Sequence, residues 1–280
     1  MAIDAHQHFW DPARAHYPWM EAPELAQIRR AFGPADLAPL LKANGIDASI
    51  VVQCRSALEE TEEFLAVAHA TPSVIGVVGW ADLTDAALGG TLDHLRTLPG
   101  GAKLVGIRHQ VHDEADADWL LRTDVQRGLA EMFTRDLTYD FLVRTRELPA
   151  AIATAKAFPQ ARFVLDHAAK PPIADGGSAE WSDRIAALAA CGNVWCKVSG
   201  LATEAKWNDW DAERLFPFVE HVANCFGEDR LIFGSDWPVC LLAGNYGEIK
   251  SALEACLVKL GGSVSEKAFE ANAKAAYRLV

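Results

Sequence analysis

The chain has 280 residues, of which 50% are hydrophobic, and its formal net charge is −12. This length and apolar content are enough for the core of one large α/β domain covering 1–280. So negative a charge argues against a nucleic-acid partner, because binding phosphates requires a basic patch.

The sequence also gives no sign of secretion or membrane insertion. Its first residues lack a basic segment followed by an apolar one, so no secretory signal peptide is expected. No uninterrupted apolar stretch approaches the roughly 20 residues of a membrane-spanning helix. The six cysteines form no Cys-x-x-Cys pair, which favours buried free thiols in a reducing compartment. These features predict a cytoplasmic protein that does not bind membranes.

Eight short apolar segments are predicted to be strands. In chain order they are 3–9, 48–54, 74–80, 104–108, 137–144, 162–167, 193–198 and 231–235. Segments with helical periodicity lie between most of them and after the last. These predicted helices are 35–44, 59–70, 85–97, 118–135, 148–157, 179–190, 211–226, 246–260 and 265–278.

Apolar strands that alternate with amphipathic helices are typical of a parallel sheet covered by helices. Eight such units in this length favour a distorted (β/α)8 TIM barrel over an open doubly wound sheet. No Gly-x-Gly-x-x-Gly follows a strand and no Gly-x-x-x-x-Gly-Lys is present, so dinucleotide-binding and P-loop folds lose their main support. Because TIM-barrel active sites lie at the C-terminal ends of the strands, polar residues there are the candidate site.

The first strand ends in His6 and His8, which the two-residue period of a strand places on one face. Two imidazoles arranged in this way can bind one divalent metal, or can polarise a carbonyl group without one. A His-x-His pair can also be two hydrogen-bonded interior histidines. Its position beside other polar strand ends favours a functional site.

Two further strands end in residues that can join this pair. The sixth ends in Asp166-His167, and we expect only His167 to face the interior because it ends the strand. The eighth is followed by Asp236, to which we assign the role of general base, taking a proton from water while the histidines or a metal stabilise the oxyanion. The alternatives are a packed histidine and a carboxylate that caps the end of its strand.

A polar cluster after the fourth strand, Arg108, His109 and His112, can donate hydrogen bonds to substrate oxygens. For Arg108 the alternative is a structural ion pair with a core carboxylate. Other polar residues at or near strand ends are weaker candidates for substrate binding, namely Gln53, Arg144 and Lys197.

The nine tryptophans offer apolar ring faces on which the C–H face of a polyol can stack. Five lie near strand ends or in connecting loops: Trp10, Trp19, Trp80, Trp119 and Trp237. We expect one or two to contact a sugar, with Trp10 as the substrate-binding candidate, although core or oligomer contacts explain the tryptophans equally well.

Four segments together make the chain resemble the amidohydrolase superfamily, and more narrowly its branch of sugar lactonases. They span nearly the whole chain and read Ile3-Asp4-Ala5-His6-Gln7-His8-Phe9-Trp10, Gly106-Ile107-Arg108-His109-Gln110, Val164-Leu165-Asp166-His167 and Phe233-Gly234-Ser235-Asp236-Trp237-Pro238. The resemblance implies a distorted β/α barrel that hydrolyses an aldonolactone, with L-fuconolactone as the expected substrate, to the open acid.

The resemblance also carries the family's metal-binding or catalytic roles onto four residues: His6, His8, His167 and Asp236. The chain departs from the dinuclear pattern of the superfamily, because its fourth strand ends in Arg108-His109 without a lysine that can be carbamylated. The fifth strand has no histidine either. The resemblance therefore implies at most one divalent metal, such as Zn²⁺, and branch members that work without a metal make it dispensable.

Two other functions stay open. A metal-dependent decarboxylase of the same superfamily shares the His-x-His pair and the aspartate after strand eight, but needs groups that hold a substrate carboxylate. A non-catalytic sugar-binding barrel is the second alternative. For a lactonase, L-rhamnonolactone and other lactones compete with L-fuconolactone, because one methylene-sized difference is worth only ~1–3 kcal/mol in a pocket. Ring size and homo-oligomer formation are also undetermined.

Overall fold

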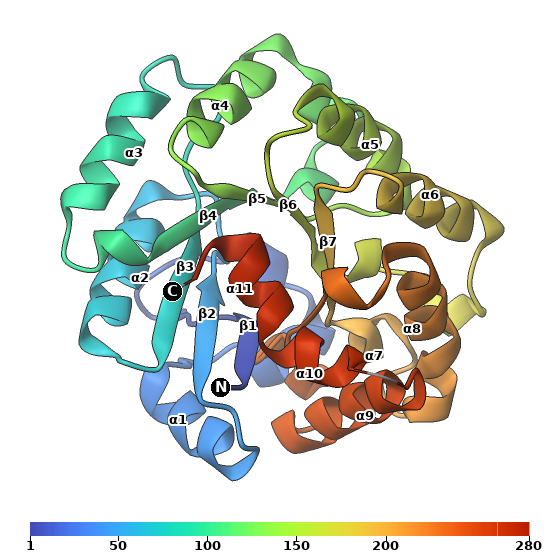
Figure 1. The fold of residues 1–280 in the computed structure, drawn as a ribbon. Helices are drawn as coiled ribbons and strands as arrows, with labels where there is room; N and C mark the ends of the chain where they lie inside the picture. The colour runs from blue at the N-terminus through green and yellow to red at the C-terminus, as the bar shows by residue number, and fades with distance from the viewer. Residues whose placement is uncertain (262, 280) are drawn as a thin grey trace.

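Eight parallel strands form a barrel at the centre of the molecule (Figure 1). The computed structural model describes residues 1–261 and 263–279. Each strand pairs with the next in the chain, and every pair is parallel. The strands are β1 (Ile3–Gln7), β2 (Ala48–Val52), β3 (Val74–Gly79), β4 (Leu104–His109), β5 (Thr138–Phe141), β6 (Phe163–Leu165), β7 (Val194–Val198) and β8 (Leu231–Phe233).

Helices surround the barrel and connect its strands (Figure 1). They are α1 (Pro34–Ala43), α2 (Leu58–Ala70), α3 (Leu88–Thr97), α4 (Thr123–Phe133), α5 (Leu148–Ala157), α6 (Ala179–Ala189), α7 (Leu201–Glu204), α8 (Ala212–Phe226), α9 (Tyr246–Lys259), α10 (Val264–Phe269) and α11 (Ala271–Tyr277). Among the described residues, no helix combines the length and the apolar character needed to cross a membrane.

The C-terminal helix α11 closes one end of the barrel, where Figure 1 shows it lying across the strands. Ala273, Ala276 and Tyr277 pack in one buried cluster with apolar side chains from the strands. Thr138 of β5 donates a hydrogen bond of 2.7 Å to the carbonyl of Ala276. This end of the barrel is therefore filled and sealed, which leaves the other end for a site.

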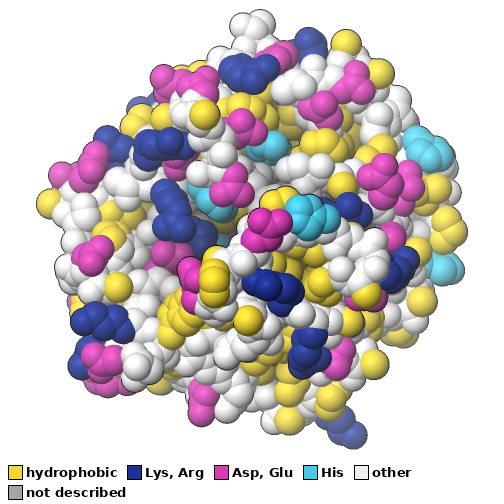
Figure 2. Space-filling view, turned by 180° about the vertical axis from the view of Figure 1, so that it is seen from behind, with side chains coloured by type: hydrophobic (Ala, Val, Ile, Leu, Met, Phe, Trp, Pro, Cys, Tyr) yellow, Lys and Arg dark blue, Asp and Glu magenta, His cyan; other side chains and the backbone are white. Residues whose placement is uncertain are grey.

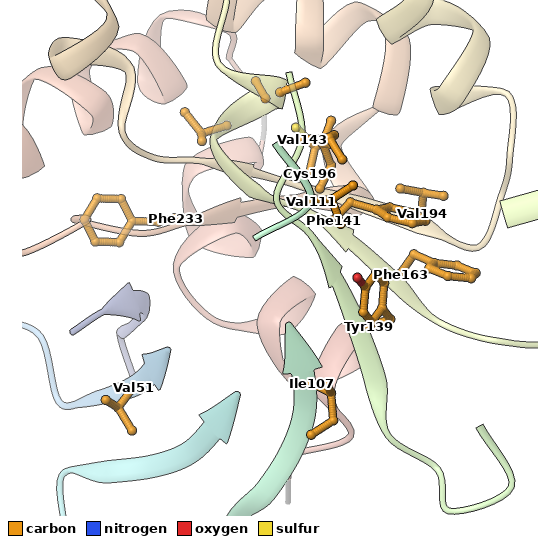
Figure 3. Packing of buried hydrophobic residues seen from close by; sticks show 14 of the residues in the cluster. Val51, Ile107, Val111, Tyr139, Phe141, Val143, Phe163, Val194, Cys196 and Phe233 are labelled. Atoms are coloured by element: carbon orange, nitrogen blue, oxygen red, sulfur yellow. The ribbon is translucent and has the colours of Figure 1, made fainter. Parts of the chain in front are cut away.

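The space between strands and helices is filled by a second, larger apolar cluster, part of which is drawn in Figure 3. The rings of Phe141 and Phe163, on neighbouring strands, stack with centroids 4.7 Å apart. Phe133 of α4 meets Phe163 edge to face, with centroids 5.2 Å apart. The stack thus joins β5, β6 and α4, and it holds the ends of both strands in place.

The predicted fold is confirmed, and so are the positions of the eight strands. Most strands end one or more residues earlier than predicted, because the chain turns where polar side chains enter the interior. The predicted helix 118–135 is in fact a short 3-10 helix, Trp119–Leu121, followed by α4. The predicted helix 265–278 is divided into α10 and α11 at Glu270, whose φ of −146° is not helical.

The Phe141–Phe163 stack gives a stability test. Phe163 has no exposed surface, so Phe163→Ala should lower the free energy of unfolding by about 3–5 kcal/mol. Urea unfolding followed by circular dichroism measures the change. The matched control is Val258→Ala on α9, which is 62% exposed and should change stability by less than about 0.5 kcal/mol. Equal effects of the two substitutions would contradict the assigned packing.

Candidate active site

The C-terminal ends of the strands open into a cavity of about 280 Å³, which is lined in part by His8, His167 and Asp236. Figure 2 views the molecule from the side opposite to Figure 1 and shows histidine and basic side chains gathered near the centre of this face. Pockets for drug-sized ligands are usually somewhat larger. The cavity therefore suits a small ligand with about the bulk of one sugar ring.

A β-bulge in β1 brings the two N-terminal histidines into the interior. Ile3 and Ala5 face the interior cluster, whereas Asp4 accepts a hydrogen bond from Tyr246 of the outer helix α9. Simple alternation would place His6 on the side of Asp4. The register between β1 and β2 shifts between Asp4 and Gln7, which is how a bulge re-aims the side chains that follow it.

Partners on neighbouring strands fix the orientation of both rings. The Nδ1 atom of His8 lies 2.7 Å from the carbonyl oxygen of Val52, which can only accept, so Nδ1 carries the hydrogen. The Nδ1 atom of His6 lies 3.3 Å from Oδ1 of Asp166. Arg108, which can only donate, lies 3.3 Å from Nε2 of His6. His6 therefore presents Nε2 as an acceptor.

His167 is fixed by a hydrogen bond of 2.8 Å between its Nδ1 and Oγ of Ser199. It begins a run of four residues with left-handed backbone, from His167 at φ 52° to Lys170 at φ 52°. Such backbone is uncommon for residues other than glycine and is found preferentially at functional sites. Gly200 packs directly against the ring, and a Cβ atom there would lie 2.6 Å from Nδ1 of His167.

All three imidazoles direct Nε2 at one oxygen atom, Oδ1 of Asp236. The Nε2–Oδ1 distance is 3.3 Å for His8 and 3.8 Å for both His6 and His167. The aspartate follows β8 and is itself left-handed, with φ 57°. Its backbone N–H donates to the carbonyl of His6 at 2.8 Å, so β1 holds Asp236 against its own histidines.

Burial lowers the pKa of His6 well below its usual value and that of His167 to about 4. Burial acts in the opposite sense on Asp236, but the surrounding imidazoles, that of His167 first, outweigh it and hold the pKa of this carboxyl below its usual value. At neutral pH an ionised carboxylate therefore faces two neutral imidazoles, a combination that can accept protons and bind cations.

The donor set fits a single divalent metal ion. Within the described residues, one ligand atom each from His6, His167 and Asp236 lie within 4.8 Å of one another. Nε2 of His8 lies only 3.2 Å from Nε2 of His6. Nε2 of His6 offers a lone pair here, and a cation beside it would also lie close to Nε2 of His8 and to the carboxylate of Asp236. Imidazole and carboxylate groups are typical zinc ligands, and the imidazole ligands usually have a partner at their second ring nitrogen.

The expectation that Asp166 faces away from the interior is wrong. Its carboxylate is fully buried inside the barrel, 2.8 Å from Arg108 and 2.9 Å from Lys197. Both Asp166 and His167 reach the interior because the left-handed backbone after Asp166 breaks the alternation of a strand. Although burial alone would raise it, the pKa of Asp166 is held well below its usual range by Lys197, His6 and Arg108.

Three of the predicted substrate-binding residues line the cavity: Arg108, His112 and Arg144. Arg108 is also paired with Asp166. It therefore forms the ion pair with a buried carboxylate that was the alternative to substrate binding, and it reaches the cavity as well. Burial, reinforced by Lys170 and Arg144, lowers the pKa of His112 to about 3. The neutral imidazole of His112 can therefore donate or accept a hydrogen bond without adding charge.

The structure does not place the other three, Gln53, His109 and Trp10, on the cavity wall. Gln53 lies behind Arg108, whose Nη2 donates to its Oε1 at 2.9 Å. His109 stacks on Trp119 with centroids 4.2 Å apart. Trp10 donates through Nε1 to the carbonyl of Ile28. Their contact with substrate stays a prediction.

Apart from Trp19, several residues that line the cavity were not among the predicted site residues. Lys170 and Glu204 form an ion pair of 2.9 Å on the wall, and Arg144 lies 3.4 Å from the same glutamate. Trp19 and Trp207 also line the cavity. Trp19 belongs to the expected group of loop tryptophans. No sequence signal marked Glu204, because the short helix α7 that carries it cannot be recognised from four residues.

Known proteins resemble this chain over its whole length. The model of the amidohydrolase family matches residues 3–279. The chain is 42% identical to an L-fucono-1,5-lactonase of Burkholderia ambifaria over 99% of this chain and 95% of that protein, and 39% identical to an L-fucono-1,5-lactonase of Burkholderia multivorans over 91% and 88%. A crystal structure of a Burkholderia multivorans amidohydrolase with bound zinc is 37% identical, covers 100% of both chains and has a TM-score of 0.94.

The barrel, the histidine and aspartate cluster at its rim and these similarities agree with the resemblance inferred from the sequence. The chain belongs to the amidohydrolase family.

Proposed function

We propose that this protein is a lactonase that hydrolyses L-fucono-1,5-lactone, or a closely related aldonolactone, to the open sugar acid. The observation that carries the proposal is the convergence of three imidazoles on the carboxylate of Asp236 at the end of a cavity of about 280 Å³. Two relatives of this chain, 42% and 39% identical to it, are L-fucono-1,5-lactonases.

In the proposed reaction the lactone carbonyl lies against the imidazoles, and Asp236 accepts a proton from the attacking water. A bond forms between the water oxygen and the carbonyl carbon. Because Nε2 of His6 is an acceptor, the negative charge on the carbonyl oxygen would be stabilised by a cation held at the histidines. The bond from this carbon to the ring oxygen then breaks. Asp236 returns its proton to the departing oxygen, and the acid product ionises and releases one proton to solvent.

We propose that four residues hold one divalent metal ion, such as Zn²⁺: His6, His8, His167 and Asp236. When bound, such an ion polarises a carbonyl and lowers the pKa of bound water. The chain prepares the ligands in advance, because Val52, Asp166 and Ser199 each hold the Nδ1 side of one ring. Contacts with the ring nitrogen that does not face the metal set which nitrogen is free to bind it.

The cavity has chemically different walls, which suits a sugar with one apolar side. Glu204, Lys170 and Arg144 offer charged groups that can bind hydroxyl oxygens. Leu242 and Val239, in the short helix after Asp236, line the cavity with apolar surface. We propose that the hydroxyls of the lactone face the first group and that its methyl group faces the second.

A decarboxylase is not favoured by the charges in the cavity. Besides the proposed metal ion, a decarboxylase needs a side chain that is free to hold the carboxylate of its substrate. The three cations on the wall, Arg108, Arg144 and Lys170, each lie within 3.4 Å of a carboxylate of the chain itself. A neutral lactone needs no such cation.

The proposal is tested by proton release in a weakly buffered indicator solution over a panel of aldonolactones. We expect the highest kcat/KM for L-fucono-1,5-lactone, with about a 10- to 200-fold loss when the methyl group is absent. Carbon dioxide release from aromatic acids is measured in parallel. No lactone hydrolysed faster than its spontaneous rate would refute the lactonase, and carbon dioxide release would replace it with the decarboxylase.

Removing the proposed base should abolish turnover without unfolding the protein. Asp236→Asn is expected to lower kcat by about 10²- to 10⁴-fold, because the amide cannot take a proton from water. Asp183→Asn is the matched control, since Asp183 is an exposed carboxylate on α6 outside the cavity. A folded Asp236→Asn variant with full activity would remove Asp236 from its role.

Metal removal tests the proposed ion. Exhaustive chelation should lower kcat, and addition of Zn²⁺ should restore it as one zinc binds per chain, measured by elemental analysis. A His167→Asn variant should bind zinc more weakly. Full activity in protein shown to be free of metal would mean that the histidines and Asp236 work without an ion.

A further inference from the structure

The interior below the candidate site contains four fully or nearly fully buried charged side chains that the proposed reaction does not use: Arg108, Asp140, Asp166 and Lys197. Lys197 of β7 lies 2.6 Å from Asp140 of β5 and 2.9 Å from Asp166. Tyr277 of α11 donates to Asp140 at 2.7 Å. A continuous set of charged contacts therefore runs from the C-terminal helix to the histidines.

Buried charges are costly, and replacing such a group by apolar residues often stabilises a protein. A cluster of apolar side chains from the strands and α11 packs in the same interior, which shows that this part of the fold can be built from apolar residues. Asp166 and Arg108 both contact the cluster at the rim, where they meet opposite sides of His6. A role in the site explains why they are there.

We propose that Asp166 is a positioning residue that fixes the tautomer of His6. This inference deepens the proposed metal-binding lactonase and rests on it. Oδ1 of Asp166 lies 3.3 Å from Nδ1 of His6, and among the residues described neither atom has a partner with full hydrogen-bond geometry, so this carboxylate is the group that can satisfy Nδ1. A carboxylate only accepts, so it requires a hydrogen on Nδ1 and leaves Nε2 as the free acceptor.

Arg108 and Lys197 keep Asp166 in the form that this role needs. Arg108 donates to Oδ2 of Asp166 at 2.8 Å, and Lys197 lies 2.9 Å from Oδ1. Two cations on one carboxylate prevent it from taking up a proton and from rotating away. Arg108 also donates toward Nε2 of His6, which opposes a hydrogen on that atom. Both contacts select the same tautomer.

Asp166→Asn tests the inference because it keeps the shape of the side chain. It replaces a carboxylate, which only accepts hydrogen bonds, by an amide whose NH₂ group donates them. Its NH₂ group takes either the place of Oδ2, where it faces Arg108, or the place of Oδ1, where it faces both Lys197 and His6 and favours a hydrogen on Nε2. The measurement is the long-range ¹⁵N–¹H correlation spectrum of the histidine rings in the metal-free full chain, with His6 assigned from a His6→Gln variant. Zinc affinity is measured separately by competition with a chromophoric chelator.

In the unmodified protein we expect His6 to carry its hydrogen on Nδ1. Asp166→Asn should shift it to Nε2 or to a mixture, and should weaken zinc binding by about 10- to 100-fold. The matched control is Asp140→Asn, which removes the same charge from the same network one contact further away. It should lower thermal stability but leave the His6 tautomer and the zinc affinity unchanged.

Three results would overturn the proposal. The first is a hydrogen on Nε2 of His6 in the unmodified protein, a result that does not depend on how any variant folds. The second is an unchanged tautomer in Asp166→Asn, and the third is an equal loss of zinc affinity in Asp140→Asn, which would indicate a simple effect of charge. Because none of these measurements uses a lactone, failure of the lactonase proposal would be visible separately, as absent turnover with normal tautomer and zinc binding.

Discussion

The structure depends on holding imidazole nitrogens and a carboxylate close together at the rim of the barrel. Nε2 of His6 and Nε2 of His8 lie 3.2 Å apart beside an ionised aspartate. The fold must hold each of these groups in place from behind. The bulge in β1, the left-handed backbone at His167 and Asp236, and the close approach of Gly200 all serve this end. Local geometry that is unfavourable by itself is thus concentrated at the rim of the barrel.

The sequence was sufficient for the architecture and for the centre of the site, and the physical reason is periodicity. Strands buried on both faces read as apolar runs, and a polar residue directly after such a run, as at Asp236, is conspicuous. His6 and His8 were found on the same principle. What the sequence could not reveal is backbone that breaks the alternation. The bulge before Gln7 and the positive φ angles after Asp166 have no residue signature, so the inward direction of Asp166 was missed.

The sequence also did not reveal which charged residues form ion pairs across the barrel. Lys197 was noted only as a strand-end residue, yet its partners Asp140 and Asp166 lie on two other strands. Sequence spacing carries no information about which strand ends meet across a barrel. The same limit applies to the wall of the cavity, where Glu204 and Lys170 come from different loops. The centre of a barrel site can therefore be predicted from single strand ends, whereas the groups that orient it require the three-dimensional arrangement.

The position of α11 has a consequence for how the protein is made. β1, which carries His6, is synthesised before α11, the helix that covers the barrel interior. Until it arrives, the charged interior beneath His6 stays open to water, and β1 also lacks its contacts with Trp237 and Asp236. The nascent chain is therefore expected to remain a substrate for chaperones until α11 has left the ribosome.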